Sequence, residues 1–203
     1  EWAANRLKAF DELLDALSRQ GLTFPVTPAR ASSCVLAGLT DNCNSVCVGH
    51  ALYGLAPMVD EMMPPAAIKP ILQSMTTQLI QVTTHGQGAD IAIAGLYKID
   101  RAKRVGVLPI GRGCGFNRPS RDSGAYVLVG GRRAPVLAVS LEHTTIDLDD
   151  CGDVAVGDEV TLLGSSHNDQ IHLADYAAWH AAGPLDVLMD FSGRAEIQVT
   201  QGR

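Results

Sequence analysis

The sequence predicts an α+β fold that is mainly β, and three observations support this prediction. Apolar runs at residues 105–110, 125–129 and 134–139 are rich in β-branched residues and Leu, and turn-forming residues separate them. Gly130-Gly131, between the last two runs, indicates a two-residue hairpin, because glycine accepts the positive φ of a type I′ turn. Residues 122–164 continue as short strands at regular spacing, which is typical of a barrel or a sandwich.

The first 20 residues predict the clearest helix of the chain. Leu7, Phe10, Leu14 and Leu17 recur with the helical period and form one apolar stripe, and a glycine follows as a stop signal. After this helix, turn-forming and helix-breaking residues separate three short elements. We expect a short extended piece, a helix and a strand at residues 23–28, 31–38 and 44–48.

The second part of the chain begins with a proline-rich linker at residues 58–65. A long strand at 70–84, a turn at 85–88 and a returning strand at 89–95 follow it. Further along, we expect one short helix at 172–182, ended by Gly183-Pro184, and a last strand at 195–200, where Ile197 and Val199 alternate with polar residues.

The bulk composition excludes several classes of partner. Of the 203 residues 46% are hydrophobic and 19% are charged, so the chain should bury a core. The net charge of −6, with Lys and Arg scattered, argues against a nucleic-acid partner, and no apolar run approaches the length that a membrane span needs. Five cysteines, an odd number, favour reduced thiols and a cytoplasmic location.

Several motifs resemble the C-terminal half of the pyridoxal-phosphate-dependent alanine racemases. Pro109-Ile110-Gly111, the strand and turn from Gly124 to Gly131, and the VGDEV-x-L-x-G motif at residues 156–164 match the β-domain of that family in spacing and order. Residues 49–57 are similar to the family's GIALYGLSP, which follows its late barrel strands. The resemblance implies a barrel-remnant segment at residues 1–64 and an alanine-racemase-like β-domain at residues 65–203.

The residues that carry the family's chemistry are replaced here. The resemblance implies a Schiff-base lysine early in the barrel, on a part that this chain does not contain, and no lysine of the chain stands in a matching motif. The family's GYADG loop aligns with residues 111–115, which puts Arg112 in place of a basic tyrosine and Cys114 in place of an aspartate. An arginine stays protonated and cannot act as a general base near neutral pH.

Other positions follow the same trend. Leu185 stands where the family has a phosphate-binding tyrosine, Cys47 where it has an arginine facing the pyridine nitrogen, and Ala29 where it has a histidine. The family's MDQ motif becomes Leu141-Glu142-His143. Among the positions that the resemblance assigns to the cofactor phosphate, only Ser33 and the backbone of Gly49 keep that character. We therefore expect no bound cofactor.

These replacements favour a non-catalytic domain, kept for structure or partner contact within a larger bacterial biosynthetic enzyme, such as a modular synthase of the polyketide type. Its partner would be a second copy, giving a homodimer, or a neighbouring domain of the parent protein. One alternative is a small enzyme using Cys114, whose thiol would tend toward thiolate beside Arg112, with His143 nearby. Another is a domain that completes the active site of a neighbouring pyridoxal-phosphate enzyme. The cysteine spacings fit structural zinc patterns poorly, so we expect no metal.

Overall fold

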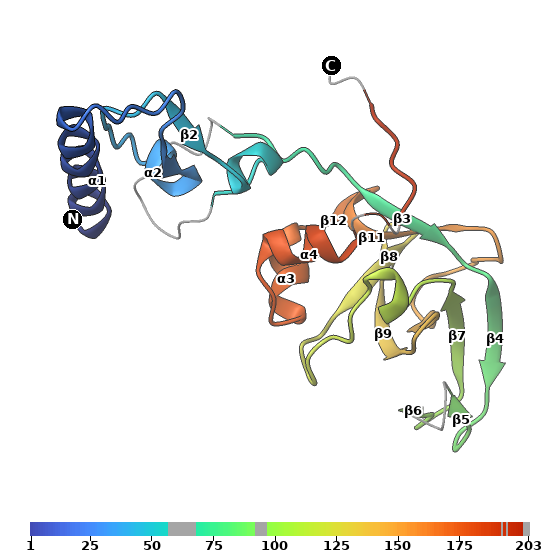
Figure 1. Ribbon diagram of the computed structural model, residues 1–203. Helices are drawn as coiled ribbons and strands as arrows, with labels where there is room; N and C mark the ends of the chain where they lie inside the picture. Colours follow the sequence, from blue (N-terminus) through green and yellow to red (C-terminus); the bar gives the residue numbers. More distant parts are fainter. Residues whose placement is uncertain (57–67, 92–96, 192, 194, 201–203) are drawn as a thin grey trace. The chain divides into compact units, whose positions relative to one another are not determined.

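The computed structural model describes residues 1–56, 68–91, 97–191, 193 and 195–200. The chain divides into two compact units, Glu1–Leu72 and Gln73–Arg203 (Figure 1). The linker expected at residues 58–65 lies outside the described residues. Each unit is described by itself below, as unit 1 and unit 2.

Unit 1 combines helices with one small parallel sheet. Its elements are α1 (Trp2–Arg19), β1 (Pro28–Ala31), α2 (Ser32–Leu36), β2 (Ser45–Cys47) and the short 3₁₀ helix η1 (His50–Tyr53). Strands β1 and β2 pair in parallel, with α2 in the connection between them. This βαβ arrangement confirms the helices and the strand expected in this part of the chain, and parallel pairing of this kind belongs to sheets that are covered on both faces.

Helix α1 ends and packs as its sequence predicts. Gly21 adopts a φ of +81°, and the N–H groups of Gly21 and Leu22 donate to the carbonyls of Ser18 and Leu17, which is a Schellman ending. On the apolar stripe, Leu7 is buried and the other three residues are half-buried. Among the described residues of unit 1, only Leu7 and Ser32 are buried, so this unit has almost no core of its own.

Unit 2 is an antiparallel β structure with helices at its C-terminal end (Figure 1). Its large sheet contains β3 (Met75–Gln78), β4 (Gln81–His85), β7 (Lys103–Leu108), β8 (Tyr126–Val129), β9 (Arg132–Val139), β10 (Thr144–Asp147), β11 (Glu159–Ser166) and β12 (Asp169–Ile171). Strands β5 (Asp90–Ile91) and β6 (Tyr97–Lys98) form a separate pair. The three strands predicted from the apolar runs are β7, β8 and β9, and their existence is confirmed.

A bend closes the sheet of unit 2. The order runs β11-β8-β9-β10-β7-β4, and β3, which precedes β4, pairs back onto β11. At the corner, the N–H of Leu79 donates to the carbonyl of Asp158 and the N–H of Ile80 donates to that of Val107. The single strand expected at 70–84 is therefore wrong: it is two strands separated by this corner, and the corner lets one stretch of chain cover both edges of the sheet.

The closed sheet of unit 2 forms a β-barrel, which encloses the hydrophobic core of this unit. The φ values of Gly130 and Gly131 are +56° and +76°, so the predicted glycine hairpin joins β8 to β9. Side chains that are at most 2% exposed come from strands β7 to β12 and from the corner before β4. Burying each one stabilises the fold by about 1.5–3 kcal/mol. They include Leu79, Leu108, Val127, Leu128, Val129, Val139, Ile146, Leu148, Leu162 and Ile171.

The C-terminal end differs from its prediction in two places. Helix α3 (Leu173–Trp179) is confirmed, but a second helix, α4 (Pro184–Phe191), follows where Gly183-Pro184 indicated a stop. Proline fits the first turn of a helix, and the Asp186 carboxylate accepts a hydrogen bond from the N–H of Gly183. The strand expected at 195–200 is wrong: this segment pairs with no strand, and Ile197 and Val199 are 78% and 91% exposed. Among the described residues, no helix is long and apolar enough to cross a bilayer.

Candidate functional site

Two loops of unit 2 bring the predicted catalytic residues to one place. We call residues 111–116 the site loop and residues 140–144 the supporting loop. The site loop contains the 3₁₀ helix η3 (Arg112–Cys114). The N–H of Arg112 donates to the carbonyl of Ser140 at 3.0 Å, and the N–H of Gly113 donates to that of Leu141 at 2.7 Å. The two loops are thus joined through their backbones.

The junction of the two loops has no room for a larger residue. A Cβ atom on Gly111 would lie 2.6 Å from the carbonyl oxygen of Ser140, so only glycine fits at this position. The Thr144 hydroxyl donates to the carbonyl of Ile110 at 2.7 Å. The Ser140 hydroxyl pairs with both backbone groups of His143 at 3.0 Å. These contacts hold the backbone of both loops in one conformation.

Helices α3 and α4 support the other side of the site loop. Phe116 is buried and packs edge-to-face on Tyr176 of α3, with ring centroids 5.8 Å apart. The Asn117 amide donates to the Asp190 carboxylate of α4 at 2.5 Å. Gly115, at a φ of +88°, lies so close to the carbonyl of Asp190 that a Cβ atom would overlap it. Sequence reasoning missed these supports, because they join residues about 60–75 positions apart.

The predicted catalytic residues lie on two joined loops, but their side chains are not coupled. Arg112 and His143 are exposed, and Cys114 is half-buried. Within the described part of the chain, no hydrogen bond or ion pair joins the side chains of these three residues. The exposed loop expected from the glycines is present, but the arrangement contains no paired nucleophile and base of the kind that covalent catalysis needs.

The buried lysine of unit 2 is paired with carboxylates, whereas the other lysines lie at the surface. Lys8, Lys69 and Lys98 are exposed. Lys103 is only 7% exposed, but its ammonium group pairs with Asp147 and Asp149. The hydrogen bond to Asp147 raises the pKa of Lys103, although burial opposes the charge. A Schiff base forms from a neutral amine, so this environment works against one.

The two residues with phosphate-binding character belong to unit 1. Ser33 is half-buried on α2, and Gly49 precedes η1. The N–H of Gly49 already donates to the hydroxyl of Ser32 at 3.0 Å, and the N–H of Ala51 donates to the same oxygen at 3.2 Å. A phosphate at Gly49 would have to displace this internal acceptor. The N–H of Gly49, as it is engaged here, therefore does not fit a bound phosphate.

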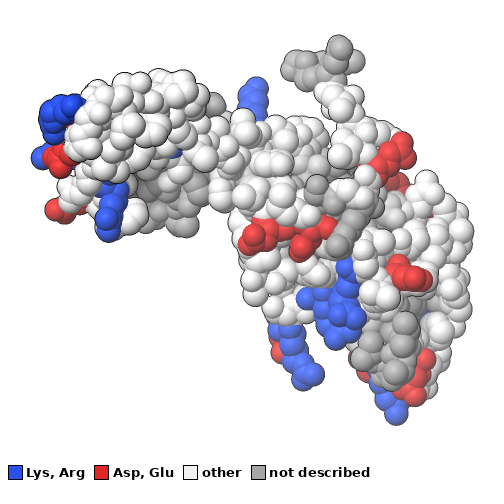
Figure 2. Space-filling view, viewed as in Figure 1, with Lys and Arg blue, Asp and Glu red and all other residues white. Residues whose placement is uncertain are grey.

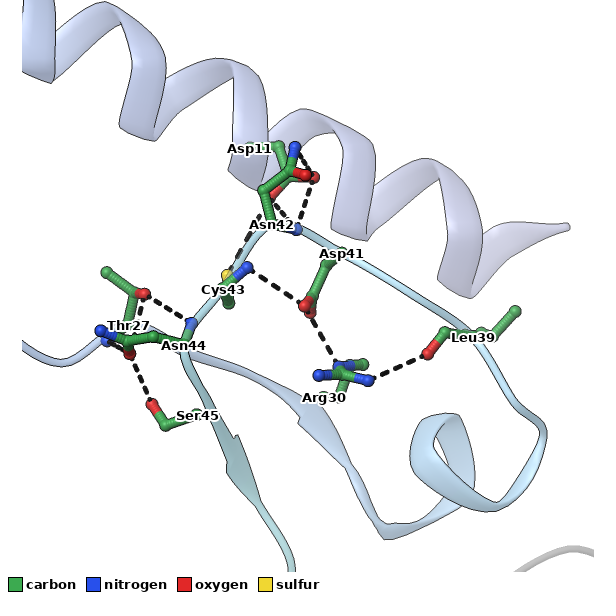
Figure 3. A network of polar contacts seen from close by, with 9 residues as sticks. All are labelled: Asp11, Thr27, Arg30, Leu39, Asp41, Asn42, Cys43, Asn44 and Ser45. Carbon is green, nitrogen blue, oxygen red and sulfur yellow. Dashed lines mark hydrogen bonds and ion pairs between the residues drawn. The ribbon is translucent and has the colours of Figure 1, made fainter.

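A polar network fixes the rest of unit 1 (Figure 3). The Asp11 carboxylate of α1 accepts hydrogen bonds from the backbone and amide groups of Asn42, and the Arg30 guanidinium lies 3.1 Å from the buried Asp41 carboxylate. Burial and the two neighbouring carboxylates, Asp41 and Asp11, raise the pKa of the Cys43 thiol. No group of three metal-ligating side chains occurs in the described ranges, and all five cysteines are free thiols.

Comparison with known proteins decides the family. The model of the family "Alanine racemase, C-terminal domain" matches residues 72–199, which is more than half of the chain. The chain belongs to this family. An alanine racemase from Thermodesulfovibrio yellowstonii is 30% identical over 198 residues, which cover 96% of this chain and 51% of that protein. The chain spans about half the length of the curated relatives it matches.

Solved structures agree with this assignment. The alanine racemase from Bacillus anthracis with bound L-Ala-P superposes with a TM-score of 0.79 at 26% identity, over 91% of this chain and 47% of that one. The enzyme from E. faecalis superposes with a TM-score of 0.76 at 29% identity, over 94% of this chain and 49% of that one. The resemblance stated from the motifs is therefore confirmed, and the mainly β, α+β fold class is confirmed with it.

The surface of the chain fits the charge pattern of its sequence. On the face drawn in Figure 2, basic and acidic side chains lie in small separate groups, and no continuous basic surface is visible. On the site and supporting loops, the exposed side chains include Arg112, Leu141 and Glu142, which combine both charges with an apolar group that is 56% exposed.

Proposed function

We propose that this chain is a non-catalytic member of the alanine racemase C-terminal family, which serves as a structural or partner-contact module of a larger biosynthetic enzyme. The observation that carries the proposal is the state of the site loop. Its backbone is held by Ser140, Leu141 and α4, while Arg112, exposed and unable to accept a proton, occupies the place of the basic tyrosine. The scaffold is kept and the base is lost.

The environment of the cofactor positions supports the same proposal. Lys103 is engaged by two carboxylates, and the N–H of Gly49 is engaged by Ser32. Pyridoxal phosphate supplies an electron sink for carbanion chemistry only when an amine and a phosphate cradle hold it in place. Since Lys103 and the N–H of Gly49 are both engaged within the protein, no step of racemisation is assigned to this chain.

The proposed role in partner contact rests on the exposed apolar surface of unit 1. Residues 1–64 would be the barrel-remnant segment that the family resemblance implies. Several large apolar side chains of this segment are exposed, at Trp2, Leu13, Leu22, Phe24, Val26, Val46 and Leu52. Strands β1 and β2 form only a two-stranded sheet, although parallel sheets are usually covered on both faces. A second copy of this chain, or a neighbouring domain of the same parent protein, would cover this surface. The five free thiols support a cytoplasmic location.

A racemisation assay tests the catalytic part of this proposal. The complete 203-residue chain is incubated with pyridoxal phosphate and L-alanine, and D-alanine is measured by chiral chromatography, with an authentic alanine racemase as the control. We expect no D-alanine above the level formed by free cofactor. Turnover that requires the protein, and that is lost when one lysine is replaced, would refute the proposal.

The alternative, an enzyme acting through Cys114, needs the thiol to be paired with a base. Cys114 is half-buried beside an exposed arginine on the site loop, which is the only observation in its favour among the described residues. Labelling with iodoacetamide separates the two possibilities. An ordinary thiol reacts no faster than the exposed Cys47, whereas an activated nucleophile reacts much faster and loses that advantage in an Arg112→Gln variant.

A further inference from the structure

The oxygen of Ser32 lies where two backbone donors converge. Ser32 begins α2 and is 3% exposed, which is unusual for a serine in a unit that buries so little. Its hydroxyl accepts hydrogen bonds from the N–H groups of Gly49 and Ala51, at 3.0 and 3.2 Å. Both donors come from a segment 17 to 19 residues further along the chain. The contact therefore ties α2 to the start of η1.

Two N–H groups that point at one oxygen form the kind of concave donor pair that proteins use to hold anions. In this chain the pair is not open, because a neutral hydroxyl of the protein itself fills it. Family resemblance assigns the backbone of Gly49 to a cofactor phosphate, and that assignment disagrees with the observed contact. Ser32 itself is only 3% exposed, and a ligand would have to replace both of its hydrogen bonds in order to displace its hydroxyl.

We infer that the Ser32 hydroxyl has taken the place of a phosphate oxygen, so that this part of the family's cofactor site is closed from within and now serves as a structural clamp. The inference rests on the proposed function, because it explains how unit 1 keeps its local fold without a cofactor. Ser32 is a positioning residue, because it holds the backbone before and inside η1. Ser33, the next residue, is half-buried, and within the described residues no hydrogen bond joins its side chain to Gly49 or Ala51.

Nuclear magnetic resonance of the complete chain tests the clamp directly, with inorganic phosphate and pyridoxal phosphate as the probes. We expect the Gly49 and Ala51 amides to exchange slowly with solvent and to show no saturable shift with either probe. In Ser32→Ala the same two amides should exchange about tenfold faster, the size expected when one protein hydrogen bond is lost. In the matched control Ser33→Ala, their exchange should stay unchanged.

Two results would overturn the inference. One is a saturable shift of the Gly49 and Ala51 amides with phosphate in the unmodified chain. The other is slow exchange that survives in Ser32→Ala. If Ser32→Ala does not fold, the titration of the unmodified chain still decides. Failure here is separable from failure of the proposed function: phosphate binding without D-alanine formation refutes the clamp alone, whereas D-alanine formation refutes the proposed function.

Discussion

The two units of this chain bury their apolar residues to very different extents. Unit 2 closes a sheet around a core to which strands β7 to β12 contribute, and it covers both edges of the sheet at the corner between β3 and β4. Unit 1 builds a helix, a parallel pair and a polar network, but buries only Leu7 and Ser32 in its described part. Both units match alanine racemases, so the difference does not come from loss of family resemblance.

The stability of the chain and its need for a covering partner belong to different units. Unit 2 contains a hydrophobic core of its own, whereas unit 1 leaves many of its large apolar side chains exposed. Hydrogen bonds such as those of Asp11 and Arg30 fix local geometry, yet they contribute little net free energy without a core. Under the proposed function, a partner surface covers unit 1, whereas the site loop belongs to unit 2, which has its own core.

The largest expected effect comes from separating the units. Residues 73–203 alone should unfold in one cooperative transition, because the barrel core lies entirely within them. Residues 1–72 alone should show no cooperative transition. Circular dichroism during urea unfolding measures both. A cooperative transition of the 1–72 fragment at low concentration would contradict the comparison.

A smaller effect is expected from Gly115→Ala. Both Gly115 and Gly124 have positive φ, so alanine costs about 1 kcal/mol of backbone strain at either position. At Gly115 the new methyl group would also overlap the carbonyl of Asp190 and push α4 away, which adds about 1–3 kcal/mol. The free energies of unfolding of Gly115→Ala and its control Gly124→Ala should differ accordingly. Equal values would show that α4 does not brace the site loop.

Unit 1 should mediate association. Leu14 lies half-buried on the apolar stripe of α1, near the exposed Leu13. A covering partner would need to bury at least about 1,000 Å² in total. Leu14→Glu should weaken self-association at least about tenfold, which corresponds to about 1.4 kcal/mol. Light scattering checks this, with Lys8→Glu on the exposed face as control. If the chain stays monomeric at high concentration, a homodimer is excluded, and a neighbouring domain of the parent protein is the proposed partner.

The smallest effect is expected at Cys114. Serine differs by one atom, and the residue is half-buried on a loop held by its backbone, so Cys114→Ser should cost less than about 1 kcal/mol. Thermal unfolding measures the change. A folded variant that has lost a measurable activity of the chain would support the thiol enzyme instead.

Much of the fold followed from local patterns. Local patterns specify α1 and strands β7, β8 and β9. In each of these elements, the apolar pattern of the sequence agrees with the way the element packs in the fold. Helix α4 was missed because Gly183-Pro184 reads equally well as an end or as a beginning. The strand expected at 195–200 had the right alternation, but a strand also needs an edge to pair with.

Less of the site was predictable. Glycines around Arg112 and Cys114 indicated an exposed loop, and in the structure Arg112 is exposed while Cys114 is half-buried. Its supports, Ser140 and Asp190, come from the supporting loop and from helix α4, further along the chain, and nothing in their local sequence marks them. The same holds for Ser32, whose acceptor role depends on the return of the chain at Gly49. Long-range contacts of this kind are a property of the tertiary fold.

Under the proposed function, the chain keeps the fold of the family but not its cofactor chemistry. The most direct test incubates the complete chain with pyridoxal phosphate, dialyses it and records the visible spectrum. Since the lysines are exposed or paired with carboxylates, we predict no retained band in the aldimine region, at about 400–430 nm. A retained band that borohydride traps on one specific lysine would contradict the account.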